Sequence, residues 1–352
     1  MIHDVRIGDR LIGPDEPPFI IAELSGNHGQ DLALAEKMVD EAAKAGAHAI
    51  KLQTYTADSM TLDVDSKDFV IGEKDSLWAG ERLHTLYAKA ATPYEWHQPL
   101  FKRANDLGML AFSSPFDSDA VDFLDNLNVP CFKIASFELT DLPLIAQAAS
   151  KGKPLIMSTG MASLAEIEEA VACAKEHGCD DILLLKCTST YPADPSNTNL
   201  MTIPNMREAF CCQVGLSDHT GGIGAAVASV ALGASVIEKH FVLNRDDGGV
   251  DAAFSLEPDE LKSLVTETER AWKAIGRVQY GGSSAELVSK QYRRSIYISE
   301  DTKKGDLLTN DNMKIVRPAF GLPPKYWNDV VGKRATQDLV KGTALCWEHV
   351  SQ

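Results

Sequence analysis

Two histidines about twenty residues apart have the type and spacing of a metal site. His219 and His240 each follow a short apolar run, and a helix-compatible stretch from Gly221 to Gly233 separates the two runs. In a strand–helix–strand unit both imidazoles would lie on one edge of a parallel sheet, where a single metal ion could bridge them. A lone histidine at a strand end is more often a satisfied structural residue, but two in register favour a metal site.

Two lysines are flanked by apolar residues in the same kind of run. Lys51 lies between Ile50 and Leu52, and Lys133 lies between Phe132 and Ile134. A buried ammonium group needs an anionic partner. With nearby hydroxyls and backbone amides, the pair predicts a phosphate or carboxylate site. Two alternatives remain open, which are internal pairing with Glu23, Glu138 or Glu238 and a Schiff-base lysine.

Eight short segments have the length and composition of buried parallel strands, and helix patterns separate them. The segments are 19–24, 47–53, 109–114, 131–136, 154–159, 182–188, 212–217 and 234–240. Among the helix patterns, one opens with the capping box Ser163–Glu166 and another runs from about Pro258 to Ile275. Eight such units in roughly 260 residues predict an α/β fold, a (β/α)8 TIM barrel. A doubly wound open sheet is the alternative, but no G-x-G-x-x-G motif follows the first strand.

Polar side chains gather at the carboxyl ends of these predicted strands, where barrels of this kind carry their active sites. They include Glu23, Lys51, Ser114, Lys133, Ser136, Ser158, Ser217, His219, Glu238 and His240. The long connection from Thr54 to about Thr92 interrupts the strand–helix alternation. A connection of this length predicts a lid or binding loop, or else a subunit interface.

The last part of the chain has a different character. Residues 281–293 read as a linker between a barrel domain at 1–280 and a small module at 294–352. Within this module Asp301-x-x-Lys304-Gly305 recurs as Asp338-x-x-Lys341-Gly342, which predicts a pseudo-symmetric β-rich fold. A unit of this size is marginally stable alone, so we expect it to dock on a barrel.

The composition of the chain excludes some classes of partner and predicts its location in the cell. The 352 residues carry a formal net charge of −16, which argues against nucleic acid or an anionic membrane as partner. No apolar run approaches the ~20 residues that span a membrane, and the start of the chain lacks the pattern of a signal peptide. The seven cysteines lie mostly in apolar runs and read as reduced core residues. We therefore expect a cytoplasmic protein.

Together, several motifs resemble those of the nonulosonic (sialic) acid synthases, and the resemblance covers nearly the whole chain. The C-terminal module looks like the antifreeze-like (SAF) domain of that family. The motifs are Ile21-Ala22-Glu23-Leu24-Ser25-Gly26-Asn27-His28, Lys51-Leu52-Gln53-Thr54, Phe132-Lys133-Ile134-Ala135-Ser136, Ser158-Thr159-Gly160-Met161, Gly215-Leu216-Ser217-Asp218-His219, Glu238-Lys239-His240-Phe241 and Arg317-Pro318. Leu24-Ser25, Leu77-Trp78-x-Gly80 and Leu86-Tyr87 look most like the branch of the family that makes pseudaminic acid.

The resemblance implies an activity and a set of partners. Members condense phosphoenolpyruvate with an open-chain acetamido sugar and water, and release phosphate. They use a divalent metal such as Mn²⁺, Mg²⁺ or Co²⁺. For the pseudaminic branch the sugar is 2,4-diacetamido-2,4,6-trideoxy-L-altrose. N-acetylneuraminate and legionaminate synthases, which share this chemistry, remain alternatives, and a non-catalytic sugar-binding protein is a more remote one.

The resemblance also implies roles for individual residues. Catalytic roles fall to Glu23, Lys51, Lys133 and Glu238, and the metal ligands would be His219 and His240. Phosphoenolpyruvate would contact Lys51, Ser114, Lys133, Ser136, Ser158, Ser189 and Ser217, although the family more often has asparagine at the position of Ser189. The sugar would face Glu23, Tyr191, Asp251 and Arg317, with Arg317 supplied by the partner subunit of a domain-swapped homodimer.

Overall fold

The computed structural model describes residues 2–72 and 77–352. By its internal contacts the chain divides into two compact units, Met1–Gly276 and Arg277–Gln352. The first carries the strand–helix units and the second carries the small C-terminal module. Within the described residues, no helix combines the length and the apolar character needed to cross a membrane.

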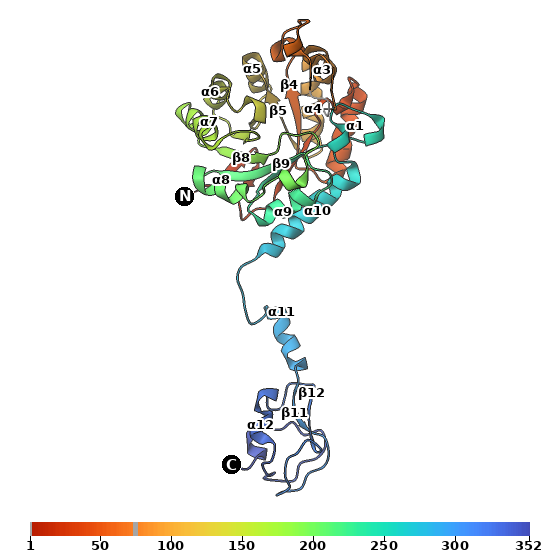
Figure 1. Cartoon of the computed structure of the whole chain (residues 1–352), viewed down its shortest axis with the longest axis vertical. Helices are drawn as coiled ribbons and strands as arrows, with labels where there is room; N and C mark the ends of the chain where they lie inside the picture. The colour runs from red at the N-terminus through yellow and green to blue at the C-terminus, as the bar shows by residue number, and fades with distance from the viewer. Residues whose placement is uncertain (1, 73–76) are drawn as a thin grey trace. The chain divides into compact units, whose positions relative to one another are not determined.

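Eight parallel strands close into a barrel in the first unit (Figure 1), so the prediction of a (β/α)8 barrel is confirmed. Around the barrel the strand order is β10-β3-β4-β5-β6-β7-β8-β9. Their bounds are β3 Phe19–Glu23, β4 Ala49–Thr54, β5 Leu110–Pro115, β6 Phe132–Ile134, β7 Leu155–Ser158, β8 Ile182–Cys187, β9 Gln213–Asp218 and β10 Val236–His240. An antiparallel pair, β1 (Val5–Ile7) and β2 (Arg10–Ile12), precedes the barrel.

Helices surround the strands and cover their outer faces (Figure 1). They are α1 Leu32–Ala45, α4 Tyr94–Asp106, α5 Ser118–Asn126, α6 Leu142–Ser150, α7 Leu164–Glu176, α8 Thr202–Phe210, α9 Gly224–Ala231 and α10 Pro258–Ile275. Local signals explain where they begin and end. The Ser163–Glu166 capping box is formed at the start of α7, and α1 ends at Gly46, whose φ of 90° suits a residue without Cβ.

Strand register brings the predicted rim residues side by side. Glu23 is paired with His240 on one side and with Lys51 on the other, and Glu238 is paired with Ser217. Because side chains of a strand alternate between its two faces, Glu238 and His240 share one face while Lys239 lies on the other. The carboxyl ends of β3, β4, β9 and β10 therefore hold their charged side chains at one edge of the barrel.

The insertion after β4 contains two short helices, α2 (Ala57–Met60) and α3 (Leu83–Ala90). Its Tyr55 and Tyr87 rings pack edge to face at 5.8 Å. The Trp78 indole donates a 3.0 Å hydrogen bond to the Val250 carbonyl, which belongs to the loop after β10. The insertion thus contacts the carboxyl end of the barrel, as expected for a binding loop. Residues 73–76 of this segment lie outside the described part of the chain.

The second unit contains the antiparallel pair β11 (Ser295–Ile298) and β12 (Met313–Val316) and has its own apolar core. This agrees with the predicted small β-rich module. The two copies of its sequence repeat form equivalent hydrogen bonds with each other. Asp301 accepts a hydrogen bond from the Lys341 backbone amide, and Asp338 accepts one from the Lys304 amide, each at 2.8 Å. The helix α11 (Ser284–Leu287) and a 3-10 helix, Val288–Tyr292, fall in the segment predicted as linker.

Candidate active site

An alternating network of ammonium and carboxylate groups forms the centre of the site. The Lys51 ammonium forms an ion pair with Glu23 and donates a 3.2 Å hydrogen bond to the Ser114 hydroxyl. The nearest Glu238 oxygen lies 3.8 Å from the Lys51 nitrogen and 3.6 Å from the Lys133 nitrogen. Both lysines are almost completely buried. The predicted convergence of Glu23, Lys51, Lys133 and Glu238 is therefore observed, and so is the alternative that the lysines pair internally.

Burial and charge act against each other on these groups. Burial raises the pKa of Glu23 to about 7, although the Lys51 ammonium opposes that shift. Burial also opposes ionisation of Glu238, yet the ammonium groups of Lys133 and Lys51 outweigh it and lower the pKa of Glu238. Near neutral pH, Glu238 is thus an anion while Glu23 divides between its two forms. With Glu23 protonated, two ammonium groups face one carboxylate, which leaves a net positive charge to attract an anion.

The pKa values of the two lysines also shift in opposite directions. Burial disfavours the charged form of Lys51, but the carboxylates of Glu23 and Glu238 outweigh it and raise the Lys51 pKa. For Lys133 burial dominates and the pKa is lowered. Lys133 also donates a 3.3 Å hydrogen bond to the Ile134 carbonyl. The negative charge of an incoming anion would raise the Lys133 pKa again and favour its ammonium form.

The two histidines lie beside this network with their ring centroids 5.3 Å apart. The Nδ1 atom of His219 is 2.9 Å from the Thr188 carbonyl, to which it can only donate, so in the neutral ring the lone pair is on Nε2. Burial opposes the charged form of this ring, but the Cys187 thiol and the Thr188 carbonyl outweigh it and raise the His219 pKa. The Nδ1 atom of His240 is 3.3 Å from the Ser25 hydroxyl and 3.6 Å from a carboxylate oxygen of Asp251. Burial lowers the pKa of His240 well below its ordinary value, which keeps that imidazole neutral.

This donor set fits a divalent cation. A ring whose Nδ1 is held by a backbone carbonyl presents Nε2 in a fixed direction, as metal-binding histidines do. The described residues contain no preformed group of three histidine, cysteine or carboxylate ligands around one point. Two imidazoles would leave other coordination positions for water and substrate oxygen, which suits a catalytic metal better than a structural one.

Aromatic rings line one side of the histidine pair. The Tyr191 ring lies 4.5 Å from the His219 ring, and the Phe254 ring lies 4.9 Å from the His240 ring. The Tyr191 and Phe254 rings are themselves 5.4 Å apart. Trp78 extends the row, with its ring 5.9 Å from that of Tyr191. The site thus has a charged side and an apolar side.

Hydroxyl groups line the other strand ends. Ser217 donates a 3.2 Å hydrogen bond to Glu238, and Ser136 accepts one of 3.1 Å from the Gly160 amide. The Ser158 hydroxyl is buried without a hydrogen-bond partner among the described residues, and so is one oxygen of Glu238. Buried polar atoms usually have a partner, so a ligand or water is expected at both. Ser189 lies beside Gly160, where a Cβ would come within 2.1 Å of its hydroxyl oxygen.

The structure adds residues that the sequence pattern did not assign to the site. Glu138 follows Ser136 in the 3-10 helix after β6, and burial raises its pKa to about 7. Gln53 donates a 3.2 Å hydrogen bond to Glu23, and the Ser25 amide donates another of 3.1 Å to the same oxygen. Glu138 could have been found by including the turn that follows the strand, but the partners of Glu23 depend on side-chain direction.

Arg317 belongs to the second unit, where it directly follows β12. Its assignment to the sugar site therefore stays a prediction. The other predicted residues, from Glu23 to Asp251, belong to the barrel unit, and their contacts with substrate or metal also stay predictions.

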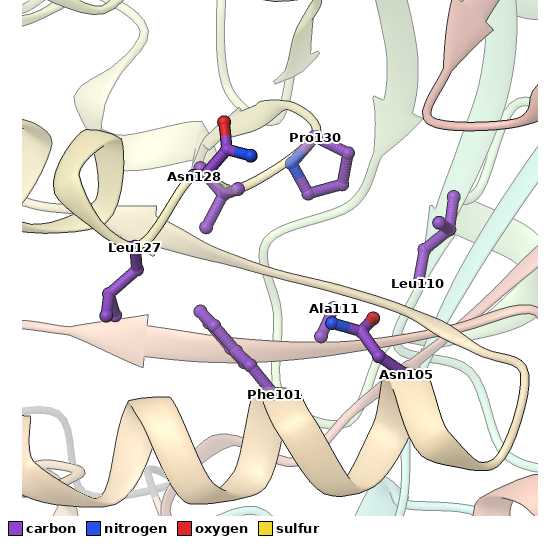
Figure 2. A pocket seen from close by; sticks show the side chains of 8 residues that line it. Phe101, Asn105, Leu110, Ala111, Leu127, Asn128 and Pro130 are labelled. Carbon is purple, nitrogen blue, oxygen red and sulfur yellow. The ribbon is translucent and has the colours of Figure 1, made fainter.

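A separate cavity of about 210 Å³ lies at the opposite end of the barrel. Figure 2 shows Phe101 and Asn105 of α4 facing it, with Leu110 at the start of β5 and Pro130 in the loop before β6. Residues at the amino ends of barrel strands contribute to stability and not to chemistry. The charged cluster at the carboxyl rim is therefore the better candidate.

Comparison with known proteins gives the class. The chain belongs to the NeuB family, whose model matches residues 38–280. A model of the SAF domain matches residues 293–351.

Individual relatives are similar along nearly all of their length. The pseudaminic acid synthase of Campylobacter jejuni subsp. jejuni serotype O:2 is 45% identical, over 94% of this chain and 96% of that protein. The pseudaminic acid synthase of Helicobacter pylori is 40% identical, over 96% and 99%. Among solved structures, the N-acetylneuraminic acid synthetase of Leptospira borgpetersenii in complex with citrate has a TM-score of 0.73 and 35% identity, covering 82% of this chain and 95% of that one.

Proposed function

We propose that this chain is a pseudaminic acid synthase, which condenses phosphoenolpyruvate with 2,4-diacetamido-2,4,6-trideoxy-L-altrose and water to give pseudaminic acid and phosphate. The choice of sugar depends on the sequence similarity of this chain to its relatives. The chain is more similar, over nearly its full length, to pseudaminic acid synthases than to the legionaminic and sialic acid relatives. Seven unpaired cysteines support the cytoplasmic location expected for such an enzyme.

Phosphoenolpyruvate would bind on the charged side of the site. Lys51 and Lys133 would hold its phosphate and carboxylate, replacing their present partners Glu23 and Glu238 in part. The hydroxyls of Ser114, Ser136, Ser158, Ser189 and Ser217 would supply further hydrogen bonds. The sugar would lie over the histidines with its aldehyde toward C3 of the enol, in contact with Glu23, Tyr191 and Asp251.

In the reaction, C3 of the enol attacks the aldehyde carbon. A new C–C bond forms, the C=O π bond breaks, and the aldehyde oxygen takes up a proton to become a hydroxyl. Positive charge then develops at C2, where the Glu238 carboxylate would stabilise it. Water adds at C2, and loss of its proton leaves a tetrahedral hemiketal phosphate. Collapse of this species breaks the C2–O bond to phosphate. With a pKa of about 7, Glu23 could take up and return protons in these steps.

The site is also proposed to hold a divalent metal, Mn²⁺, Mg²⁺ or Co²⁺, on His219 and His240. Such an ion would act as a Lewis acid on the aldehyde oxygen. The support comes from the orientation of the His219 ring by the Thr188 carbonyl and from the neutral state of His240.

The metal proposal is tested by chelation and by mutation. Chelator-treated protein should release no phosphate from phosphoenolpyruvate plus sugar, and added Mn²⁺ should restore the reaction. His219→Ala and His240→Ala should each lose turnover and metal binding but keep the thermal unfolding transition. Full activity without metal, or a lysine adduct trapped by borohydride, would instead indicate a Schiff-base aldolase.

The sugar is tested by parallel assays with three precursors, the altrose derivative, the legionaminic precursor and N-acetylmannosamine. We expect the highest kcat/KM for the altrose derivative. Faster turnover of either other sugar would reassign the enzyme within the family. Sugar binding without turnover under any metal would favour a non-catalytic binding protein.

The active unit is proposed to be a homodimer in which Arg317 of the partner subunit reaches the sugar. The support is the residue's place in a small separate unit, on a loop rich in proline and glycine. Arg317 itself is exposed on that unit. A guanidinium group there could donate to the amide or hydroxyl oxygens of the sugar.

A further inference from the structure

In the row of rings beside the histidines, only Tyr191 has a role in the proposed function so far, as a contact of the sugar. The row consists of Trp78, Tyr191 and Phe254, and we call it the aromatic wall. The three residues come from distant parts of the chain, namely the insertion after β4, the loop after β8 and the loop after β10. Neighbouring ring centroids are 5.9 Å apart for Trp78 and Tyr191, and 5.4 Å apart for Tyr191 and Phe254. The Phe254 ring is buried, whereas the Tyr191 and Trp78 rings are partly exposed, so Phe254 supports an apolar surface that Tyr191 and Trp78 present next to the histidine pair.

Trp78 occupies the outer end of this wall, next to Tyr191 and Asp251, two of the residues assigned to the sugar. Its ring neighbours Tyr191, and its indole nitrogen donates a hydrogen bond of 3.0 Å to the Val250 carbonyl, one residue before Asp251. Its side chain is only partly buried. A sugar whose aldehyde end lies over the histidines would therefore extend its remaining carbons along the wall toward Trp78.

The altrose derivative and N-acetylmannosamine differ in chemistry at that remote end. The altrose derivative carries a methyl group at C6 and an acetamido group at C4, whereas N-acetylmannosamine has hydroxyls at both positions. Methyl groups gain by contact with aromatic faces, while hydroxyls lose water there without gaining a hydrogen bond. An aromatic wall thus favours the deoxy, diacetamido sugar.

We infer that Trp78 is a specificity-determining residue, whose indole receives the apolar groups at the far end of a 6-deoxy diacetamido sugar. This inference rests on the proposed function. It deepens that function by assigning the choice between sugars to one side chain of the insertion. One methyl group in an apolar site typically changes kcat/KM about 10- to 200-fold, so an effect of that order is expected.

The test compares Trp78→Ala and Trp78→Phe, each assayed with the altrose derivative and with N-acetylmannosamine. The Ala variant should lose about tenfold or more of the preference for the altrose derivative, by a lower kcat/KM for that sugar alone. The Phe variant keeps an aromatic face but has no N–H for Val250. It should retain the preference to within about threefold.

Trp272→Ala serves as the matched control. Trp272 also donates its indole N–H to a backbone carbonyl, that of Pro14 at 2.9 Å, but it lies on α10 outside the barrel. This variant should leave the ratio of the two kcat/KM values unchanged. The phosphoenolpyruvate KM should also stay unchanged in the Trp78 variants, because the wall lies on the sugar side.

The outcomes separate the inference from the proposed function. If the wild-type protein prefers N-acetylmannosamine, the proposed function itself fails. If it prefers the altrose derivative and Trp78→Ala keeps that ratio, only the role of Trp78 is wrong. Equal losses for both sugars in both Trp78 variants would show that the indole merely holds the Val250 loop, which also overturns the inference.

Discussion

The Lys239 ammonium donates a 3.0 Å hydrogen bond to the Asp218 carboxylate, and both side chains are buried. Each partner immediately precedes one of the two histidines, Asp218 before His219 and Lys239 before His240. Since side chains alternate along a strand, the ion pair lies on the outer face of the barrel behind the imidazoles. Lys239 also donates to the Thr220 backbone carbonyl, so it contacts the residues on both sides of His219.

The first prediction is that this ion pair sets metal affinity. Lys239→Met should destabilise the fold by about 3–5 kcal/mol, because it leaves Asp218 charged and buried without a partner. The double variant Asp218→Asn, Lys239→Met removes both charges and should recover much of that loss. Its Mn²⁺ affinity, measured by calorimetric titration, should still be about 10- to 100-fold weaker than that of the wild type, because the histidine backbone is less constrained.

Lys175→Met, an exposed change on α7, is the control for the loss of a lysine. Thermal unfolding of all variants separates the stability effect from the binding effect. Wild-type Mn²⁺ affinity in the folded double variant would contradict the positioning role of the pair.

A second prediction concerns pH and phosphoenolpyruvate. Because the pKa of Glu23 is about 7 in the ligand-free site, a bound anion that adds negative charge and draws Lys51 away should raise it further. Binding then takes up a proton at pH values between the free and the bound pKa. The Kd for phosphoenolpyruvate should therefore increase with pH above about 7, by up to tenfold per pH unit for one proton.

Titration calorimetry between about pH 7.5 and 9 checks this, since the substrate phosphate is already fully ionised there. Proton uptake follows from comparing buffers of different ionisation enthalpy. Glu23→Gln has no proton to exchange and should show a flat profile, with Glu41→Gln, at a partly buried position on α1, as control. A flat profile in the wild-type protein would mean that Glu23 does not titrate with binding.

Gly160 gives a third prediction. A Cβ at this position would lie 2.1 Å from the Ser189 hydroxyl and 2.8 Å from the Ser136 hydroxyl. Gly160→Ala must therefore displace two groups assigned to phosphoenolpyruvate, and its KM should rise about tenfold or more while the KM for sugar changes less. Gly224→Ala, where a Cβ meets no atom within 4 Å, should have little effect on either constant. Equal effects on both KM values would place the serines outside the phosphoenolpyruvate site.

The sequence was sufficient for the barrel because its strands are short apolar runs with charged ends. The flanking residues of Lys51 and Lys133 were enough to predict that both side chains are buried. What it could not supply were contacts between distant loops. Trp78 meets Val250 and Tyr191 only through folding of the insertion, and the Asp218–Lys239 pair depends on the register of β9 and β10. Nor could composition decide that Lys51 is paired with Glu23, because Glu138 and Glu238 were equally plausible partners.

The fourth prediction tests the swapped homodimer. Arg317→Ala and His240→Ala should each be inactive alone. After subunit exchange an equal mixture should regain up to roughly a quarter of normal activity, because half of the dimers then have one intact site out of two. Subunit exchange is checked by differently tagged chains. An inactive mixture after demonstrated exchange would mean that Arg317 acts within its own chain.

The folding of the C-terminal unit depends on the crossed hydrogen bonds between its two repeats, Asp301 with Lys341 and Asp338 with Lys304. Neither half completes its own turn, since each aspartate caps a backbone amide in the other half. A single half would find its missing cap only in a second copy of itself. The unit thus resembles a two-fold symmetric dimer of peptides that has been joined into one chain. Cutting the chain between the two repeats should leave two fragments that fold only when they are mixed.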